Sequence, residues 1–543
     1  MTTDPYVDAG STASPSRFAL YGMPAPQPAH GWALDAVVAP NPLYGANGIR
    51  IAPDGSLWIT QVNGDHITAW VPTTGELVIA DPMGSPMGGP DDVAFDAAGD
   101  CYVTETLNNK VSARRGGGYV VLLEDTRGPN GITIDPSNDR LFVDEMAEGG
   151  RVLELDRERP GEVRVIAEGL DWLNALERGA DGRLYIPQVF AGQVIAVDVD
   201  SGAVEVVATD LGLPTAVKFH PDGSLVVSEA AAGVITAIDL VSGTRRSVCR
   251  PGPGIDNFCF DGNGALYTSN FVEARVERWS AGEAELVDRI APGGLIGPAS
   301  VAAWEGGGLI VADHNSIVRV HDGGRLERLT SLLGNQQFVA DAALHVAGTI
   351  VALTLAGEVV TIDPATGATT KLIEATGSMN DQLLGLSAKL CSAVATDGTR
   401  VLAGVDHDVV AMGTDGNGRS TTSFGQARID AIAAAGDLIA ISDREEGTVV
   451  VRGPGGDTTV DGFDQPEAIA FHAGALFVAE TGSRRITRVA LDGSRRDVVV
   501  ESAPIGMPQP CGRLGRSTSL HADGDAVYVG CDGDGSILRL STV

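Results

Sequence analysis

The sequence lacks the features that place a chain in a membrane or in an oxidising compartment. No run approaches the ~18 apolar residues of a transmembrane helix, and no basic stretch followed by an apolar one opens the chain, as a secretory signal would. The six cysteines form no C-x-x-C pair and no zinc spacing, so we expect reduced thiols. We therefore expect a cytoplasmic protein with no membrane partner, and we interpret residues 1–17 as a disordered lead-in.

Aromatic and basic residues are also scarce. Aromatics make up 5% of the chain, and 38 basic residues face 71 acidic ones, for a formal charge of −33. Such a field repels phosphate backbones and anionic lipids, which argues against nucleic acid as a partner. There is no G-x-S-x-G elbow, P-loop or Rossmann fingerprint either. A small-molecule ligand is the remaining expectation, and a homo-oligomer is compatible with the composition.

What the chain has in abundance is turn residues, with 70 glycines and 28 prolines, and an internal repeat. Segments such as "ANGIRIAPDGSLWITQ" from Ala46, "GPNGITIDPSNDRLFVDE" from Gly128 and "PEAIAFHAGALFVAE" from Pro466 recur at a period of about 40 residues. Each unit predicts four short strands separated by turns, which is typical of a β-propeller blade. Twelve units exceed the usual blade number of one ring. We therefore predict an all-β fold of two tandem six-bladed β-propellers with four-stranded antiparallel blades.

The two ends of the chain suggest how the rings close. We predict that an N-terminal strand at Ala33–Ala39 completes the sixth blade and that Ala284–Ile290 completes the twelfth. The first propeller would then span residues 18–280 and the second residues 281–543. In the alternative, the N-terminal strand completes the twelfth blade and the two rings form one entangled unit.

The first residue of each blade's inner strand is expected at one mouth of the central channel. In the first ring five of these six residues are Asn or Asp, and carboxylate and amide oxygens converging on an axis are ligands for a hard cation such as Ca²⁺. The alternative is that they cap the preceding turns and that water fills the channel. The first-ring set is Asn47, Asp91, Asn130, Asn174, Thr215 and Asp256; the second-ring set is Ser300, Asp341, Cys391, Asp430, Glu467 and Ser517.

The first ring resembles the gluconolactonase/regucalcin (senescence marker protein) family of six-bladed calcium propellers. "PDDVAFDAAGDCYVTE" from Pro90 is similar to that family's P-N-D segment, and "GPNGITIDPSNDRLFVDE" is similar to its P-N-G segment. The resemblance implies a Ca²⁺ or other divalent cation held by Asp91, Asn130, Asn174 and Asp256, although three of these four residue types differ from the family's. It also implies hydrolysis of a lactone or other carboxylic ester.

Several residues of the first ring are candidates for this chemistry. Asp256 and Asp91, with Asp92 beside the latter, are candidate general bases, and Asn257 is a candidate oxyanion donor. His66 is the one first-ring histidine expected on the same face, and an exposed loop histidine is the alternative interpretation. Candidate substrate-binding residues are Asn47, Thr215, Glu105, Gln188 and Asn270.

Two other functions stay open. "DGSLWITQVNGDHITAWVPTTGELV" from Asp54 resembles streptogramin B (virginiamycin B) lyases, which implies opening of a cyclic ester by elimination. A proton-abstracting site without metal would then lie in the second ring, with the residues His314, His407, Glu467 and Asp341. Alternatively, the propellers form a binding platform without catalysis.

Overall fold

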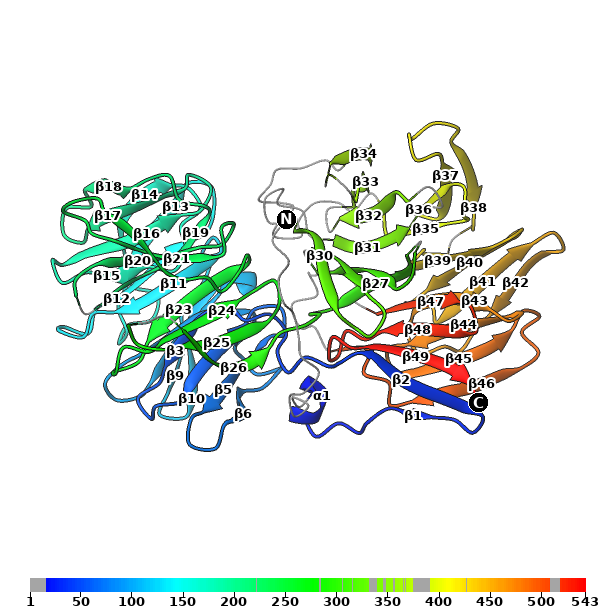
Figure 1. Ribbon diagram of the computed structural model, residues 1–543, viewed down its shortest axis with the longest axis horizontal. Helices are drawn as coiled ribbons and strands as arrows, with labels where there is room; N and C mark the ends of the chain where they lie inside the picture. The colour runs from blue at the N-terminus through cyan, green and yellow to red at the C-terminus, as the bar shows by residue number, and fades with distance from the viewer. Residues whose placement is uncertain are drawn as a thin grey trace. The chain divides into compact units, whose positions relative to one another are not determined.

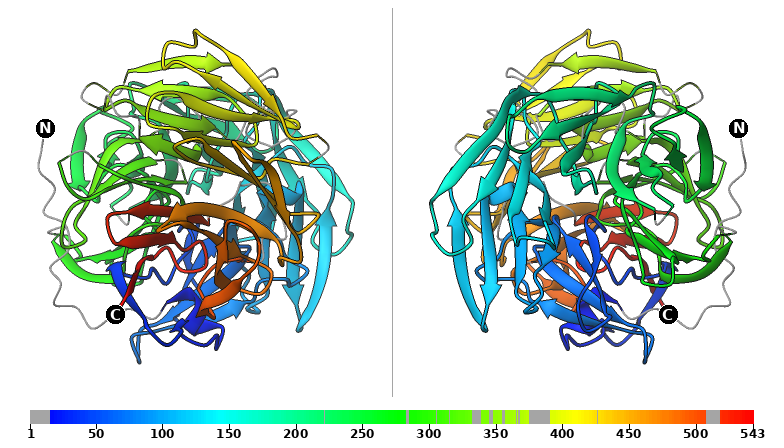
Figure 2. Two further views of the ribbon diagram at one scale, coloured as in Figure 1. Left: turned by 90° about the vertical axis from the view of Figure 1, so that its right-hand side faces the viewer. Right: turned by 90° about the vertical axis from the view of Figure 1, so that its left-hand side faces the viewer.

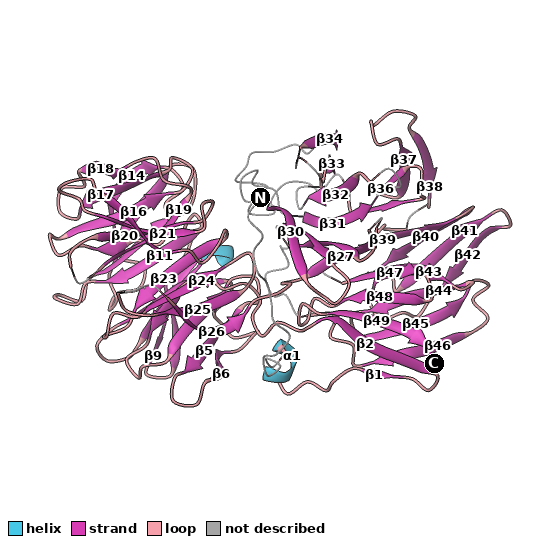
Figure 3. Ribbon diagram, viewed as in Figure 1, coloured by secondary structure: helices cyan, strands magenta, loops and turns pink. Residues whose placement is uncertain are grey.

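The computed structural model describes residues 16–220, 222–282, 285–304, 306–314, 316–331, 339–344, 348–354, 357–364, 366, 368–374, 391–425, 427–507 and 518–543. These residues form twelve antiparallel sheets, one of five strands and eleven of four (Figure 1). Nearly all regular structure is strand (Figure 3), and the two helices α1 (Arg17–Leu20) and η1 (Thr106–Asn108) are short. Among the described residues, no helix has the length and the apolar character needed to cross a membrane. The chain thus folds as two six-bladed β-propellers, as predicted.

The first propeller is the continuous segment Leu43–Gly293. In each blade the chain runs from an innermost strand outward to a fourth, outermost strand. In blade order, the strands are β3 (Ile49–Ile51), β4 (Leu57–Gln61), β5 (His66–Val71) and β6 (Glu76–Asp81); β7 (Pro90–Phe95), β8 (Cys101–Glu105), β9 (Lys110–Arg115) and β10 (Gly118–Leu123); β11 (Pro129–Ile134), β12 (Leu141–Glu145), β13 (Gly150–Leu155) and β14 (Val163–Leu170); β15 (Glu177–Arg178), β16 (Arg183–Gln188), β17 (Gln193–Asp198) and β18 (Val204–Ala208); β19 (Pro214–Phe219), β20 (Leu225–Glu229), β21 (Val234–Ile238) and β22 (Arg245–Cys249); β23 (Ile255–Phe260), β24 (Leu266–Asn270), β25 (Arg275–Trp279) and β26 (Leu286–Pro292).

The second propeller combines the N-terminal segment up to Pro42 with the chain from Gly294 onward. Its blades follow one another around a common centre (Figure 2). In the same order, the strands are β27 (Pro298–Ala303), β28 (Leu309–Asp313), β29 (Ser316–Val320) and β30 (Leu326–Ser331); β31 (Val339–Leu344), β32 (Ile350–Thr354), β33 (Val359–Ile362) and β34 (Thr369–Ile373); β35 (Ala393–Thr396), β36 (Val401–Val405), β37 (Asp408–Met412) and β38 (Ser420–Ser423); β39 (Ala431–Ala435), β40 (Leu438–Asp443), β41 (Thr448–Gly453) and β42 (Gly456–Val460); β43 (Pro466–His472), β44 (Ala475–Glu480), β45 (Arg485–Ala490), β46 (Arg496–Glu501) and the added β1 (Gln27–Pro28); β47 (Ser519–Asp523), β48 (Ala526–Gly530), β49 (Ile537–Thr542) and β2 (Trp32–Val38).

The predicted closure of the rings is wrong, and the alternative strand pairing is the one observed. β2 pairs with β49 of the twelfth blade, with Leu34 opposite Leu540, whereas β26 pairs with β25 of the sixth blade, with Arg275 opposite Pro292. Only a short turn separates β25 from β26, so they close as a hairpin with little loss of chain entropy. The first propeller therefore covers residues 43–293 rather than 18–280.

Arg17, which we assigned to a disordered lead-in, is instead fully buried in the second propeller. Its Nε donates to Gly533 O at 3.0 Å, and its Nη2 donates to Ile296 O at 2.8 Å and to Asp532 O at 2.9 Å. These carbonyls belong to the twelfth blade and to the segment that leads into the seventh, so Arg17 ties the two sides of the ring closure together. Residues 1–15 of the predicted lead-in lie outside the described residues.

The core lies between consecutive blades, because each sheet is covered on both faces. Between the second and third blades, for example, Tyr102 and Val111 pack with Ile132, Leu141 and Leu153. This burial explains why strands such as β8 and β12 are apolar without alternation.

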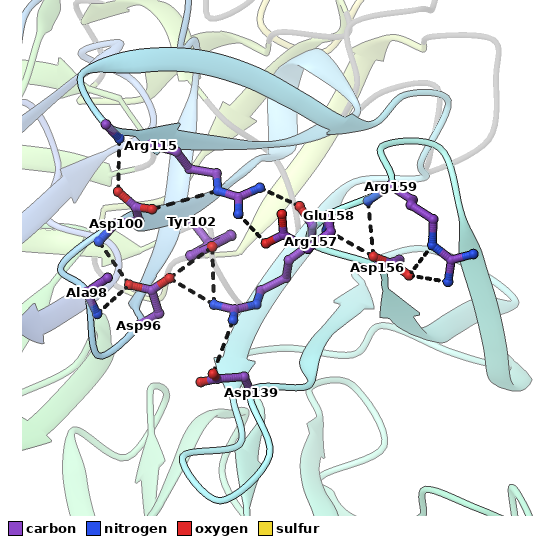
Figure 4. Close-up of polar contacts among 11 residues, drawn as sticks. Asp96, Ala98, Asp100, Tyr102, Arg115, Asp139, Asp156, Arg157, Glu158 and Arg159 are labelled. Atoms are coloured by element: carbon purple, nitrogen blue, oxygen red, sulfur yellow. Dashed lines mark hydrogen bonds and ion pairs between the residues drawn. The ribbon is translucent and has the colours of Figure 1, made fainter.

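Polar contacts also link the second and third blades (Figure 4). They lie near the C-terminal ends of the inner strands. Arg157 Nη1 lies 2.9 Å from Asp96 Oδ2 and donates to Tyr102 Oη at 3.2 Å, while Nη2 lies 3.4 Å from Asp139 Oδ2. Burial raises the pKa of Tyr102 to about 12, so its phenol stays protonated and donates to Asp96. The contacts fix the blades at this face, and the candidate site lies at the other face.

Candidate functional site

The six predicted channel residues of the first propeller, which we call the mouth residues, lie at one level of the ring. In five blades the residue before the mouth residue pairs with the last residue of the second strand. Asp256 is half-buried, and the other five mouth residues are buried. The pairs that set this level are Pro90–Glu105, Pro129–Glu145, Leu173–Gln188, Pro214–Glu229 and Ile255–Asn270.

Glycine follows the mouth asparagine in two blades because the neighbouring inner strand leaves no room for a side chain. A Cβ on Gly131 would lie 2.5 Å from Leu176 N, and a Cβ on Gly48 would lie 2.5 Å from Asp91 O. Both contacts are to backbone atoms, which cannot move aside as a flexible side chain can. The Asn-Gly steps therefore mark where adjacent blades approach most closely.

A hydroxyl just before the end of the second strand joins neighbouring blades around the mouth. Thr104 Oγ1 lies 3.4 Å from Asp92 O in its own blade and 2.5 Å from Asn130 O in the next. Ser269 Oγ bridges Asn257 O and Asn47 O in the same way, at 3.1 and 2.6 Å. Thr60 and Ser228 make the same bridge in the first and fifth blades.

In the third blade this hydroxyl is replaced by a fully buried carboxyl, Asp144. Its Oδ1 accepts from Gly131 N at 2.9 Å, and its Oδ2 has no hydrogen-bond partner among the described residues. Burial raises the pKa of Asp144 to about 7. Sequence reasoning missed this residue, although Thr or Ser stands at its position in four other blades.

Asp91 and Asp256 are the electrostatic centre of the mouth. Burial, and then the charges of Asp256 and Asp92, raise the pKa of Asp91 well above its usual range. Burial and the charge of Asp92 raise the pKa of Asp256 to about 7. Among the described residues neither carboxyl forms an ion pair with a basic side chain; Asp91 Oδ2 accepts from Thr106 Oγ1 at 3.0 Å. Such a pair either shares a proton or is neutralised by a bound cation.

Of the four predicted metal ligands, the carboxylates of Asp91 and Asp256 fit a cation, whereas the two amides do not in this arrangement. The Nδ2 atoms of Asn130 and Asn174 face Met146 Sδ at 3.6 and 3.5 Å. Their Oδ1 atoms accept from Ala175 N at 3.2 and 2.8 Å. Across the described residues, no group of three His, Cys, Asp or Glu side chains is arranged to hold a metal.

The remaining mouth residues and their neighbour Asn257 have local partners. Asn47 Oδ1 accepts from Val62 N at 3.2 Å, and Thr215 Oγ1 lies 2.9 Å from Ser228 Oγ. Asn257, the predicted oxyanion donor, is buried, and its Oδ1 accepts from Phe258 N at 2.8 Å. Asn257 therefore orders its own strand in this structure.

The predicted substrate-binding residues at the second-strand ends have structural contacts. Glu105 accepts from Gly88 N at 2.7 Å and pairs with Lys110 at 3.1 Å. Gln188 accepts from Gln193 Nε2 at 2.7 Å. Asn270 donates to Pro253 O at 2.8 Å and accepts from Glu273 N at 3.0 Å. Each side chain fastens a loop to the end of its strand, which is why a polar residue repeats there.

His66 is 1% exposed, and its Nδ1 lies 2.7 Å from Gly64 O in the turn between β4 and β5. A Cβ on Gly64 would meet both the His66 ring and Tyr44, so the imidazole is packed inside this turn. The predicted catalytic histidine is thus buried at the start of β5 and is not an exposed loop residue.

The predicted second-propeller site is not assembled from the described side chains. His314 is buried, and burial lowers its pKa to about 4, whereas His407 is exposed with Nδ1 3.0 Å from Ala427 O. These histidines belong to blades that are not neighbours. Asp341 pairs with Leu353, which places it one residue beyond the mouth position of its blade, and its side chain lies outside the described part.

Four of the six second-ring mouth positions were predicted one residue out of register. Strand pairing puts Ala299 rather than Ser300 at the first position, because Ser300 pairs with Ala312 as Ala216 pairs with Ser228. By the same pairing, the mouth positions of this ring are Ala299, Ala340, Ser392, Asp430, Glu467 and Thr518.

The two acids that remain at the second-ring mouth are paired with arginines. Arg428 Nε lies 3.3 Å from Asp430 Oδ1, and Arg444 Nη1 lies 3.7 Å from Glu467 Oε2. Burial and the charge of Asp532 raise the pKa of Glu467 to about 7 despite this pairing. Arginines of the second ring thus neutralise its mouth acids, whereas the mouth acids of the first ring have no basic partner among the described residues.

The fold and the site together define a twin six-bladed β-propeller with a carboxyl pair at the mouth of its first ring. No protein-family model and no curated protein sequence matches the chain. Among solved structures, it is similar to a streptogramin B lyase at 18% identity and a TM-score of 0.38, covering 55% of this chain and 98% of the lyase. A catalytically inactive virginiamycin B lyase from Staphylococcus aureus with quinupristin matches at 17% identity and a TM-score of 0.38, over 55% of this chain and 98% of that one. A candidate gluconolactonase matches at 14% identity and a TM-score of 0.37, over 45% and 90% of the two chains. Both families that the sequence resembles are therefore among the similar structures.

Proposed function

We propose that the mouth of the first propeller is the active site of an enzyme that cleaves a small lactone or other carboxylic ester. The observation that supports the proposal is the pair Asp91 and Asp256, two interacting carboxyls to which no described basic side chain is bound. Their counterparts in the second ring, Asp430 and Glu467, have arginine partners, so this pair is a particular feature of the first ring.

The two carboxyls have different surroundings, which suits different roles. The Thr106 hydroxyl fixes Asp91 Oδ2, whereas Asp256 is the more exposed of the two. Near neutral pH their mutual repulsion leaves one carboxyl protonated and one ionised. The ionised carboxyl takes a proton from a water as the water oxygen bonds to the ester carbonyl carbon. The protonated one gives its proton to the departing alkoxide as the acyl C–O bond breaks.

A divalent cation such as Ca²⁺ is part of the proposal. Asp91 and Asp256 would hold it, and when bound it would polarise the ester carbonyl and keep both carboxyls ionised. Asn130 and Asn174 would contribute oxygens only after turning their amides away from Met146.

The test combines metal content with ester turnover. We expect Asp91→Asn and Asp256→Asn each to lower lactone or ester turnover by about 10²–10⁴-fold, and to remove any dication that the purified protein carries. Asp200→Asn makes the same chemical change at a side chain that is 87% exposed and lies in the turn between β17 and β18. Full activity in both mouth variants would overturn the proposal, and metal retained in both would overturn the cation site.

Elimination at the same mouth is the second candidate, and the raised pKa of Asp256 favours it. A carboxyl with a pKa of about 7 is a suitable base for removing a proton next to a carbonyl. Hydrolysis in ¹⁸O-labelled water places one label in the product acid, whereas elimination places none and leaves an alkene. If no ester is consumed by either route, the mouth is a binding site without catalysis.

A further inference from the structure

An apolar layer covers the mouth of the first propeller. It is formed by the six residues that directly follow the second strands, which we call the rim: Val62, Thr106, Met146, Val189, Ala230 and Phe271. Three contacts place the rim on the mouth residues. Val62 N donates to Asn47 Oδ1, Thr106 Oγ1 donates to Asp91 Oδ2, and Met146 Sδ accepts from Asn130 and Asn174.

Five of the six rim side chains are apolar, so the surface next to the carboxyls is mostly hydrocarbon and thioether, apart from the Thr106 hydroxyl. Met146 and Phe271 are half-buried and offer partly exposed surface. Next to Val189, Phe190 is 40% exposed and packs edge-on against Trp172 at 5.1 Å between ring centres. Apolar walls with a few polar groups at the base are typical of small-molecule sites.

Neither the rim nor the mouth contains a basic residue. The basic side chains Lys110 and Arg151 in the nearby strands are bound to Glu105 and Glu145. On the inner strands, Lys218 Nζ lies 3.1 Å from Glu177 Oε2 and Arg50 Nη2 donates to Ile132 O. The charges of Arg50 and Lys218 act on Asp92, one residue farther along the strand than Asp91, so an anionic substrate at the rim would meet the carboxyls of Asp91 and Asp256 first. The hydroxyls of a sugar lactone would face the apolar rim and lose hydrogen bonds to water, which disfavours binding of the sugar lactone.

The fifth blade has the smallest side chains in its rim loop. Its rim loop is Ala230, Ala231 and Ala232, and the last two are exposed. Asp256, the more exposed mouth carboxyl, is the second residue of β23, the inner strand of the next blade. Ala230 thus occupies the rim position that the larger Met146 and Phe271 occupy in the third and sixth blades.

From this arrangement we infer that the substrate is an uncharged ester with alkyl or aryl substituents, and not a polyhydroxylated or anionic lactone. The inference rests on the proposed function. The substituents contact the rim, the ester group reaches the Asp91–Asp256 pair, and the substrate enters over the alanine loop of the fifth blade.

The test compares two lactones of one ring size, a γ-alkyl-γ-butyrolactone and a sugar γ-lactone. We expect kcat/KM for the alkyl lactone to exceed that for the sugar lactone by at least about tenfold. Met146→Gln, which has nearly the same size but is polar, should reduce this preference by about tenfold, whereas the apolar control Met146→Leu should preserve it. Ala231→Trp should lower kcat/KM for the alkyl lactone.

Binding of an alkyl-substituted cyclopentanone, which cannot be hydrolysed, separates the inference from the proposed function. If neither lactone is turned over but the ketone binds and Met146→Gln weakens it, the hydrolase proposal fails and the apolar site stands. A preference for the sugar lactone, equal use of both lactones, or a ketone affinity that Met146→Gln leaves unchanged would each overturn the inference.

Discussion

Asp144→Asn should stabilise the first propeller at alkaline pH. The wild-type carboxyl occupies a position where four other blades use a hydroxyl donor, and an asparagine restores an N–H donor without changing the size of the side chain. Only the protonated form of Asp144 can act in this way, because a carboxylate has no hydrogen to donate.

The direction and size of the effect follow from the raised pKa. The folded chain holds the Asp144 proton up to a pH of about 7, whereas an ordinary Asp loses it near 3.8. Between these values the folded state binds more protons than the unfolded state, so the unfolding free energy falls as the pH rises and levels off above about 7. At about 1.4 kcal/mol for each pH unit, the loss approaches about 4 kcal/mol. Asp144→Asn should lack this loss.

The measurement is urea unfolding of the full chain at pH 4.5, 6 and 8, with hydrogen exchange in the Pro129–Gln188 segment to locate the transition. Wild type and Asp144→Asn should be nearly equally stable at pH 4.5, and the variant should be the more stable at pH 8. Asp144→Ser, which introduces the hydroxyl of the other blades, is the matched control and should also lose the pH dependence. Parallel pH profiles for wild type and Asp144→Asn would refute the reasoning.

Three shorter predictions test other parts of the structure. Arg17→Met should destabilise the second propeller by about 3–5 kcal/mol, because it removes three hydrogen bonds to buried carbonyls; calorimetry that shows no lowered transition would contradict this role. Gly131→Ala should destabilise the first propeller by about 1–3 kcal/mol, since its Cβ would lie 2.5 Å from a backbone nitrogen, whereas Gly118→Ala, with its closest contact at 3.5 Å, should change the urea midpoint little. In protein freed of dications, ester turnover should rise as the pH rises through about 7, because Asp256 then loses its proton and can act as the base; a rate that does not change between pH 5 and pH 8 would contradict this assignment.

The sequence predicts the blades well because the features that define them are local. A turn and two apolar runs recur in every unit, and the structure has one sheet for each, with four strands in eleven blades and five in one. Closure of the rings depends instead on which distant strand fills an open edge, and the strand lengths fit either choice. The observed pairing follows from the short turn between β25 and β26, a local constraint that our prediction did not weigh.

The same distinction applies to the site. In the first ring Pro-Asn-Gly and Pro-Asp-Asp steps mark the inner-strand starts, so the mouth residues were located correctly. The second ring lacks these steps. Ser300 and Asp341 were predicted at the mouth, but each is the residue that follows the mouth position of its blade. The roles of Glu105 and His66 depend on contacts with loops and turns, to which sequence spacing gives no guide.

The pairing of β2 with β49 also sets an order of events during synthesis. β2 ends at Val38 and β49 begins at Ile537, so β2 leaves the ribosome long before its partner strand is made. At about 5–20 residues per second, the wait is roughly 25–100 s. The first propeller has all of its own strands by Pro292 and can fold during this interval, while β2 still presents an unpaired edge. Completion of the second ring therefore waits for β49, and a truncated chain that lacks β49 would keep β2 available to other chains or to chaperones.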